Sequence, residues 1–232
     1  MQHLGPGDFA HRLEFCKWLN GSRQLHRYTL FTDEAQFNRD DVNNTHNSHV
    51  WADENPHATV ESNLQLRFSV NVWCAVLDDQ LIGPFILEGR LTGEAYLRFL
   101  QEESPRLLED VPLNKRGRLH FQHDGATPHF SRDVRNFLNS LFPGRWIGRG
   151  GPHNWPASQP DLSPLDYCLW GWMKELVYSV KVGTRDALLG RILDAADHVR
   201  NSQRKLQRAT RAVPNRAAGC FAAGGGIFEN RL

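Results

Sequence analysis

The sequence has few cysteines and no long apolar run, and both absences narrow the kind of protein it can encode. Its 232 residues include four cysteines, which lie far apart and form no Cys-x-x-Cys pair. They are therefore expected to be free thiols in a reducing compartment, rather than a disulfide framework or a zinc site. The apolar runs are only a few residues long, so no transmembrane span is expected. The first residues lack a basic stretch followed by an apolar one, so no secretory signal is expected either.

The chain carries almost no net charge, but its charge is unevenly distributed. Residues 1–180 contain 17 Lys and Arg against 22 Asp and Glu, and residues 181–232 contain 10 against 4, so the balances of −5 and +6 sum to +1. A basic C-terminal segment could follow the phosphates of a nucleic acid, but a solvated helical surface explains it equally well. Composition alone therefore does not identify a nucleic-acid partner.

Hydrophobic periodicity predicts a mixed α/β domain built on one sheet. The expected strands are residues 28–31, ending at Asp33, the alternating run 64–77, the run 81–87 after a turn, and residues 119–122. The expected helices are residues 9–20 and three that begin with the caps Thr92, Ser131 and Ser163. Residues 143–162 are expected to form a loop, and residues 203–226, whose pattern is weak, to pack loosely.

Three stretches place an aspartate where a predicted strand or loop meets the next element: Phe31-Thr-Asp-Glu-Ala-Gln-Phe37, Phe121-Gln-His-Asp-Gly-Ala-Thr-Pro-His-Phe130 and Pro160-Asp-Leu-Ser-Pro-Leu-Asp-Tyr-Cys-Leu-Trp-Gly171. If Asp33, Asp124 and Asp166 converge, each charged pair at roughly 4 Å repels by about 4 kcal/mol. Such a cluster needs protons or a cation. Carboxylate oxygens suit Mg²⁺ or Mn²⁺, and two such ions can drive phosphodiester chemistry.

Each aspartate also has a purely structural explanation. Asp33 is followed by Glu34, and the pair could be a polar strand end. Asp124 precedes a glycine and could form a turn, and Asp166 could be the acidic partner of a capping box with Ser163. Taken singly, the structural explanations are favoured; taken together with the neighbouring residues, the metal site is favoured.

These neighbouring residues closely resemble the catalytic domain of Tc1/mariner-type transposases. The resemblance covers about residues 4–230 and rests on the three stretches above, on Arg145-Trp-Ile-Gly-Arg-Gly-Gly-Pro152, on Trp155-Pro156 and on Gly225-Gly-Ile-Phe-Glu229. It implies an α/β, RNase H-like mixed sheet flanked by helices and a DDE/DDD metal triad. Asp33 matches the first ligand, Asp124 the second and Asp166 the third. The interval between the last two holds 41 residues, a DD41D-like spacing.

The resemblance also implies a function. A member of this family is expected to be a nuclear, metal-dependent DNA endonuclease and strand transferase with two Mg²⁺ or Mn²⁺ ions. It would cut DNA at transposon ends and join the exposed 3′-hydroxyl to target DNA, so DNA is the expected partner; a homodimer is left open and no membrane is expected. His129 matches a family position near the site, with a functional and a purely structural role about equally expected.

The resemblance predicts three parts of the chain: a helical lead-in (1–20), the RNase H-like catalytic domain (21–202) and a basic, Gly-rich tail (203–232). The N-terminal helix-turn-helix modules that read transposon ends in this family are expected to be absent, because the sequence begins at the catalytic domain. Two alternatives remain: a catalytically inactive, transposase-derived DNA-binding or interaction module, and an RNase H-like nuclease acting on RNA–DNA hybrids.

Overall fold

The computed structural model describes residues 4–5, 7–22, 24–39, 68–156 and 159–229, which are built around a five-stranded sheet. The strands lie in the order β3 (Gln80–Leu87), β2 (Ser69–Leu77), β1 (Thr29–Asn38), β4 (His120–Gln122), β5 (Trp146–Ile147). β1 and β2 pair antiparallel, as do β2 and β3, whereas β1 with β4 and β4 with β5 pair parallel. The sheet is therefore mixed, as predicted.

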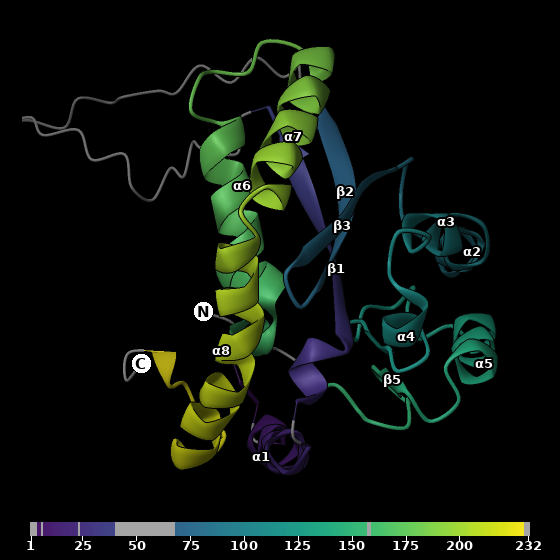
Figure 1. Cartoon of the computed structure of the whole chain (residues 1–232), viewed down its shortest axis with the longest axis vertical. Helices are drawn as coiled ribbons and strands as arrows, with labels where there is room; N and C mark the ends of the chain where they lie inside the picture. The colour runs from purple at the N-terminus through teal and green to yellow at the C-terminus, as the bar shows by residue number, and fades with distance from the viewer. Residues whose placement is uncertain (1–3, 6, 23, 40–67, 157–158, 230–232) are drawn as a thin grey trace, which may run out of the picture.

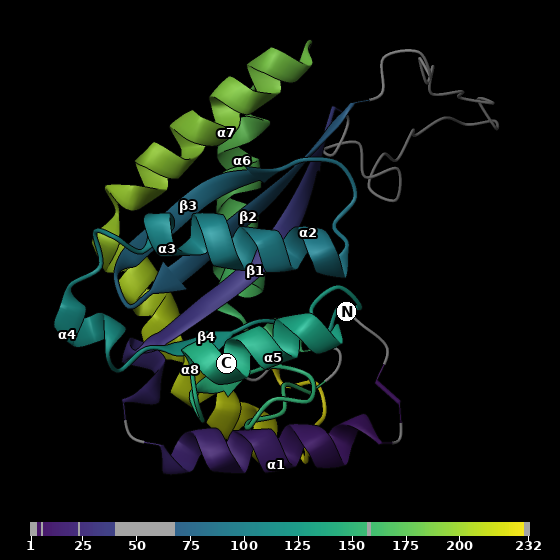
Figure 2. The same ribbon diagram turned by 90° about the vertical axis from the view of Figure 1, so that its right-hand side faces the viewer.

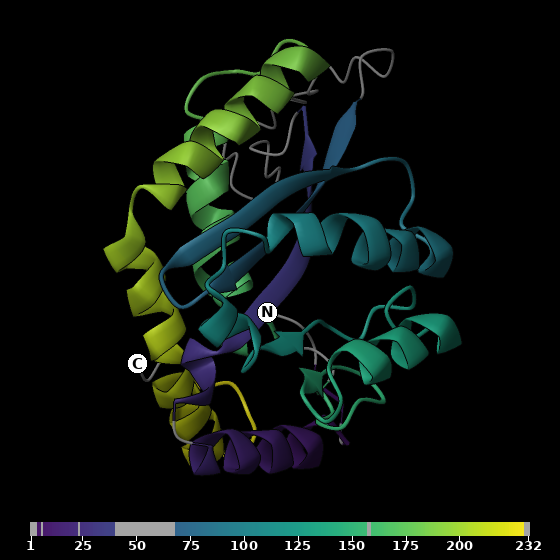
Figure 3. The same cartoon turned by 45° about the vertical axis from the view of Figure 1, so that its right-hand side comes forward.

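Helices cover both faces of this sheet. They are α1 (Asp8–Gly21), α2 (Gly93–Arg98), α3 (Ser104–Leu107), α4 (Leu113–Arg116), α5 (Arg132–Leu141), α6 (Trp170–Val177), α7 (Arg185–Arg200) and α8 (Gln203–Ala222). Figures 1 and 3 show α6, α7 and α8 on one side of the strands, and α2, α3 and α5 on the other. α1 crosses one end of the molecule (Figure 2), where it packs against α8.

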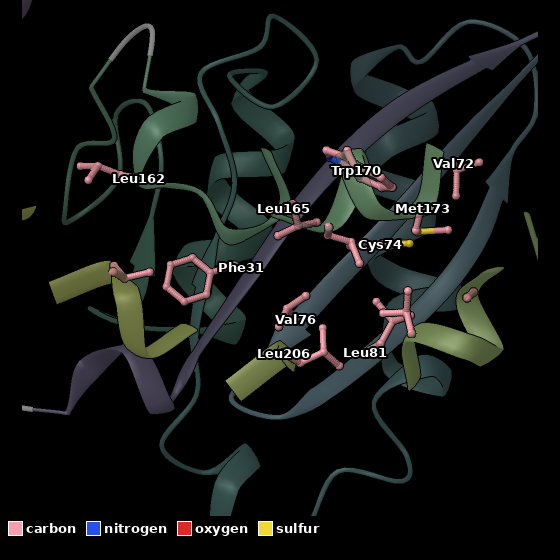
Figure 4. Packing of buried hydrophobic residues seen from close by; sticks show 14 of the residues in the cluster. Phe31, Val72, Cys74, Val76, Leu81, Leu162, Leu165, Trp170, Met173 and Leu206 are labelled. Carbon is pink, nitrogen blue, oxygen red and sulfur yellow. The ribbon is translucent and has the colours of Figure 1, made fainter. Parts of the chain in front are cut away.

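Alternate side chains of the central strands enter two separate hydrophobic cores. Phe31 on β1 and Cys74 on β2 belong to the core that includes α6, α7 and α8. Their neighbours Leu30 and Trp73 belong to the core on the opposite face. This follows from the strand geometry, in which successive side chains point to opposite faces. Figure 4 shows the first core, to which β2 contributes Cys74 and α6 contributes Met173.

Strand β1 is longer than the sequence pattern predicts. It does not end at Asp33, because its second half continues to pair with β2 as far as Asn38, and Phe37 is fully buried. β3 and β4 confirm the predicted strands, whereas residues 64–67 of the other predicted strand lie outside the described residues. The predicted loop 143–162 contains the short strand β5 and a 3₁₀ turn, Pro160–Leu162.

Two predicted helix caps are confirmed and the third is wrong. The hydroxyls of Thr92 and Ser131 each accept the backbone N–H three residues later, at 3.2 and 3.4 Å. A π-helical segment continues α2 through Phe99–Glu103. The helix predicted to start at Ser163 instead begins with a π-helical segment, Leu165–Leu169, which no side chain caps. We call Leu165–Leu169 the π turn.

The sequence pattern did not predict α7 and α8. Many of the inward-facing positions of α8 carry small side chains, such as Ala209 and Ala217, and Pro214 lies within the helix, so its periodicity is weak. The expected loose packing of residues 203–226 is wrong, because α8 packs along α1 and contributes to the core. The division into 1–20, 21–202 and 203–232 stays a prediction.

The structure bears on two expectations from the sequence, free cysteines and the lack of a transmembrane span. All four cysteines are free, as predicted. No helix in the described part of the chain has the length and apolar character needed to cross a membrane.

Candidate active site

The three predicted aspartates line one pocket, although they come from separate parts of the chain. The pocket has a volume of about 240 Å³, and it is lined by Thr32, Asp33, Gln122, Asp124, Gly125, Trp155, Pro156, Gln159, Pro160, Ser163 and Asp166. β1, the end of β4, and the turns before α6 therefore form its walls. The three aspartates therefore share one pocket, whereas their role as metal ligands stays a prediction.

The sheet register aligns the first two aspartates. In the parallel ladder between β1 and β4, Phe31 lies opposite Gln122. Asp33 and Asp124 each follow this paired position by two residues, so they lie at the same level of neighbouring chain segments. Ligand sites of α/β proteins commonly form at the carboxyl ends of parallel strands, where β4 delivers Asp124.

Asp166 lies on the π turn that leads into α6. Leu165 and Leu169 at the ends of this turn are buried in the core, whereas Asp166 is exposed between them. π turns are rare and are found often at functional sites. Partial desolvation, with the nearby charge of Asp124, raises the pKa of Asp166 to about 6 although a contact with Ser163 lowers it. The capping-box explanation of Asp166 is wrong, because no side chain caps this segment.

Asp33 accepts a hydrogen bond from Trp170, whose indole Nε1 lies 2.7 Å from Oδ2. Burial, followed by the charge of Asp166, raises the pKa of the Asp33 carboxyl to about 8 in spite of this bond. The two acids thus repel each other across the pocket, which a proton or a cation would relieve. Trp170 lies in the third stretch of the sequence, but only the packing of α6 on β1 brings its indole to Asp33.

His129 connects Asp124 to Glu34. Its Nδ1 lies 2.6 Å from Oδ1 of Asp124, and its Nε2 lies 3.3 Å from a carboxylate oxygen of Glu34. Burial alone would lower the pKa of His129, but the charge of Glu34 and the hydrogen bond to Asp124 outweigh it and raise that pKa to about 10. The imidazolium donates to Asp124 and keeps the pKa of this carboxyl low although the residue is partly buried. His129 therefore contacts the site directly.

The turn-forming explanation of Asp124 also has support. The backbone N–H of Ala126 donates to Oδ1 of Asp124 at 2.9 Å, the same oxygen that His129 contacts. Among the described residues no hydrogen bond reaches the other oxygen, Oδ2. A single residue can therefore shape the turn with one oxygen and present the second to the pocket. Glu34 was not predicted as part of this network; its position next to Asp33 in a strand, facing the other way, was the available signal.

The donor set of the pocket fits a hard divalent cation. The three carboxylates are joined by the buried amide oxygen of Gln122, which has no hydrogen-bond partner among the described residues. Oxygen ligands of this kind suit Mg²⁺ and Mn²⁺. In the described ranges, no three His, Cys, Asp or Glu side chains are close enough together to hold a metal ion as they stand. Cation binding would therefore require the carboxylates to draw closer, and it would reverse the raised pKa values of Asp33 and Asp166.

The mixed five-stranded sheet flanked by helices is that of an RNase H-like fold, and comparison with known proteins shows which of them share it. No family model matches the chain. The transposable element Tc3 transposase of Caenorhabditis elegans is 27% identical over 197 residues, which are 84% of this chain and 55% of that protein. The chain thus spans about half the length of this curated relative.

Solved structures of Mos1 transposase are similar over nearly the whole chain. The Mos1 catalytic domain with raltegravir and Mn has a TM-score of 0.72 at 20% identity, covering 99% of this chain and 100% of that one. A pre-cleavage Mos1 transpososome has a TM-score of 0.73 at 20% identity, covering 98% of this chain and 66% of that one. The structural likeness confirms the predicted RNase H-like fold. With the Tc3 similarity, it also confirms the resemblance to Tc1/mariner transposase catalytic domains.

Proposed function

We propose that this chain is the catalytic domain of a DNA transposase, a metal-dependent endonuclease and strand transferase. One observation carries the proposal: Asp33, Asp124 and Asp166 line a single pocket beside an RNase H-like sheet. The similarity to Tc3 transposase supports it, as do the Mos1 catalytic domain structures with Mn and with Mg. The proposed substrates are transposon ends and target DNA, in line with the paired-end and strand-transfer complexes of Mos1.

The three aspartates, with Gln122 beside them, would hold the divalent cations. Bound there, Mg²⁺ or Mn²⁺ would lower the pKa of an attacking water or 3′-hydroxyl and stabilise the leaving oxygen of the phosphodiester. The protein itself prepares the ligands. Trp170 holds one oxygen of Asp33 and His129 holds one oxygen of Asp124, so each carboxylate has a fixed orientation. The positive charge of His129 also keeps Asp124 ionised at neutral pH.

The cellular location and the oligomeric state of the protein remain proposals. The nucleus is the proposed location, because the proposed substrate is chromosomal DNA. A second copy of the chain is the proposed protein partner, and its support is the existence of paired-end complexes of Mos1.

The function can be tested by nicking of supercoiled plasmid DNA with Mn²⁺ or Mg²⁺. Asp124→Asn should reduce metal-dependent nicking by about 10²-fold or more, because the loss of one carboxylate weakens cation binding at the reacting phosphate. Asp133→Asn is a matched control, since this exposed acid lies in the first turn of α5, outside the pocket. Equal nicking by Asp124→Asn and the unsubstituted chain would contradict the assignment.

The two alternative functions predict different results when the same purified chain is tested. A catalytically inactive module would show neither nicking nor heat of Mn²⁺ binding in calorimetry. A hybrid nuclease would cleave an RNA–DNA hybrid in preference to duplex DNA of the same sequence.

A further inference from the structure

The loop that follows β5 holds one charged side chain, Arg149, between glycines that the packing requires. A Cβ at Gly148 would lie 2.3 Å from Cδ2 of His123, and one at Gly150, whose φ is +73°, would lie 2.9 Å from Cε2 of Phe130. Larger residues at these positions would clash with the rings or strain the backbone. The N–H of Gly148 donates to the carbonyl of His153 at 3.0 Å, which closes the loop. The backbone position of Arg149 is therefore well defined.

Arg149 lies at the edge of the acidic pocket. A Cβ at Gly125, a residue of the pocket wall directly after Asp124, would lie 3.7 Å from the Cβ of Arg149. The guanidinium carbon of Arg149 is 4.4 Å from the ring centroid of Phe130, and that of Arg135 on α5 is 4.5 Å from the same centroid. One aromatic ring thus holds two guanidinium groups beside the second aspartate. We call Phe130, Arg135 and Arg149 the rim cluster.

The two cations of the rim cluster have no acidic partner in the described part of the chain. Some exposed arginines of the helices do have one: Arg98, Arg106 and Arg200 each pair with a carboxylate of their own helix or of the helix-like segment before it, whereas others, such as Arg185 and Arg204, form no ion pair among the described residues. Nε of Arg135 is buried and lacks a hydrogen-bond partner among the described residues. Two like charges held on one ring repel each other, and an anion between or beside them would remove this cost.

We infer that Arg149 and Arg135 bind the phosphodiester backbone of DNA on the Asp124 side of the pocket. The inference rests on the proposed function and adds where the substrate strand lies. A strand that approaches the three carboxylates is repelled by them, and cations at the rim compensate for this repulsion. Guanidinium groups suit the task, because they bind phosphate oxygens with two parallel hydrogen bonds while stacking on an aromatic ring.

The experiment measures binding of a fluorescent duplex by anisotropy in EDTA, over a series of salt concentrations, so that cleavage plays no part. Each of Arg149→Ala and Arg135→Ala should reduce the slope of log K against log salt by about one, and the double variant by about two. Arg106→Ala is the matched control, because this exposed arginine pairs with Glu103 on the far side of the sheet from α6 and does not line the acidic pocket. Its slope should equal that of the unsubstituted chain.

Arg149→Lys separates charge from geometry, because lysine keeps the charge but not the planar stacked group. It should retain the salt slope and lose part of the affinity. An unchanged slope in Arg149→Ala, with an unchanged thermal midpoint showing that the variant is folded, would overturn the inference. If the unsubstituted chain itself binds no duplex, the proposed function fails; if it binds and Arg149→Ala has no effect, only the inference fails.

Discussion

Among the carboxyl groups of the described residues, Asp33 has the pKa that is raised furthest above its ordinary value. Its pKa is about 3.8 in the unfolded chain and about 8 in the folded one, because burial and the neighbouring Asp166 disfavour its charged form. Between these two pH values the folded chain binds a proton that the unfolded chain has released. The free energy of unfolding therefore decreases as the pH rises from about 4 to about 8, and at neutral pH the folded chain bears the cost of keeping this carboxyl protonated.

Asp33→Asn should accordingly stabilise the protein at pH 7, by an amount on the order of 1–3 kcal/mol, and the gain should shrink towards pH 4. The amide oxygen of asparagine can still accept the hydrogen bond from Trp170. Urea unfolding at several pH values measures the effect, with the exposed Asp110→Asn as a control. A difference that stays constant with pH would contradict the prediction.

The unsubstituted chain and Asp33→Asn can also be compared for their stabilisation by a bound cation. Added Mn²⁺ should raise the unfolding midpoint of the unsubstituted chain by mass action, and should raise it much less in Asp33→Asn. Asp33 thus lowers the free energy of unfolding when no metal is bound, and Mn²⁺ binding would restore this free energy.

At the scale of elements, the contact between α6 and β1 determines where Asp33 points. Trp170 begins α6, is almost fully buried, and packs edge-on against Phe37 of β1 while its indole N–H reaches Asp33. Trp170→Phe keeps an aromatic ring but removes the donor. We expect it to weaken Mn²⁺ binding about 10- to 100-fold in calorimetry, which is typical of a lost hydrogen bond to a metal ligand.

Trp172→Phe is the control for this substitution. Trp172 lies two residues further along α6, where it contacts Lys205 and His198 rather than the pocket. Equal losses of Mn²⁺ affinity in both variants would indicate general damage to α6, and no loss in Trp170→Phe would show that the indole does not orient Asp33.

Elements could be predicted from the sequence where local signals determine them. The caps Thr92 and Ser131 follow from hydroxyl chemistry three residues before a free N–H, and the hairpin of β2 and β3 from alternation around a turn. Local signals failed where distant partners decide. β1 continues past Asp33 because β2 pairs with it, and α8 is held by packing against α1 and the sheet rather than by a strong apolar stripe.

At the scale of the whole molecule, one buried arginine connects both ends of the chain to the pocket. Arg12 of α1 is 1% exposed; its Nε donates to the carbonyl of Gly225 at 2.7 Å, and its other nitrogens bind the carboxylate of Asp161 at 3.1 and 2.5 Å. Arg216 of α8 binds the carbonyl of Asp161 at 2.5 Å. Asp161 lies in the 3₁₀ turn before the π turn, so these contacts help to position Asp166.

Arg12→Ala should therefore destabilise the protein by about 3–5 kcal/mol, because it leaves Asp161 without its partner in a nearly buried site. Chemical unfolding measures this cost. Arg98→Ala, which breaks an exposed ion pair on α2, should cost only about 0.5 kcal/mol or less. A cost below about 1 kcal/mol for Arg12→Ala would show that Arg12 does not hold these segments together.

The site as a whole could be predicted only in part. The ordered set of Asp33, Asp124 and Asp166 came from the resemblance, and no local pattern could have shown that they share a pocket. Their convergence depends on the parallel pairing of β1 with β4 and on the contacts that hold the π turn. The contacts of His129 with Asp124 and Glu34 likewise become visible only when strand, loop and helix are assembled.

The loop that carries Arg149 has a consequence for how such chains can diverge. Asp124 is supported by β4 and His129, and Asp166 by the buried π turn, so neither is held by the loop after β5, in which Pro152 and Asn154 are exposed. Surface loops tolerate insertion and deletion better than the elements they join. We expect related chains to lengthen or shorten here without moving either carboxylate. The number of residues between the second and third aspartates would then record loop length, and chains with different counts could share the same arrangement of ligands.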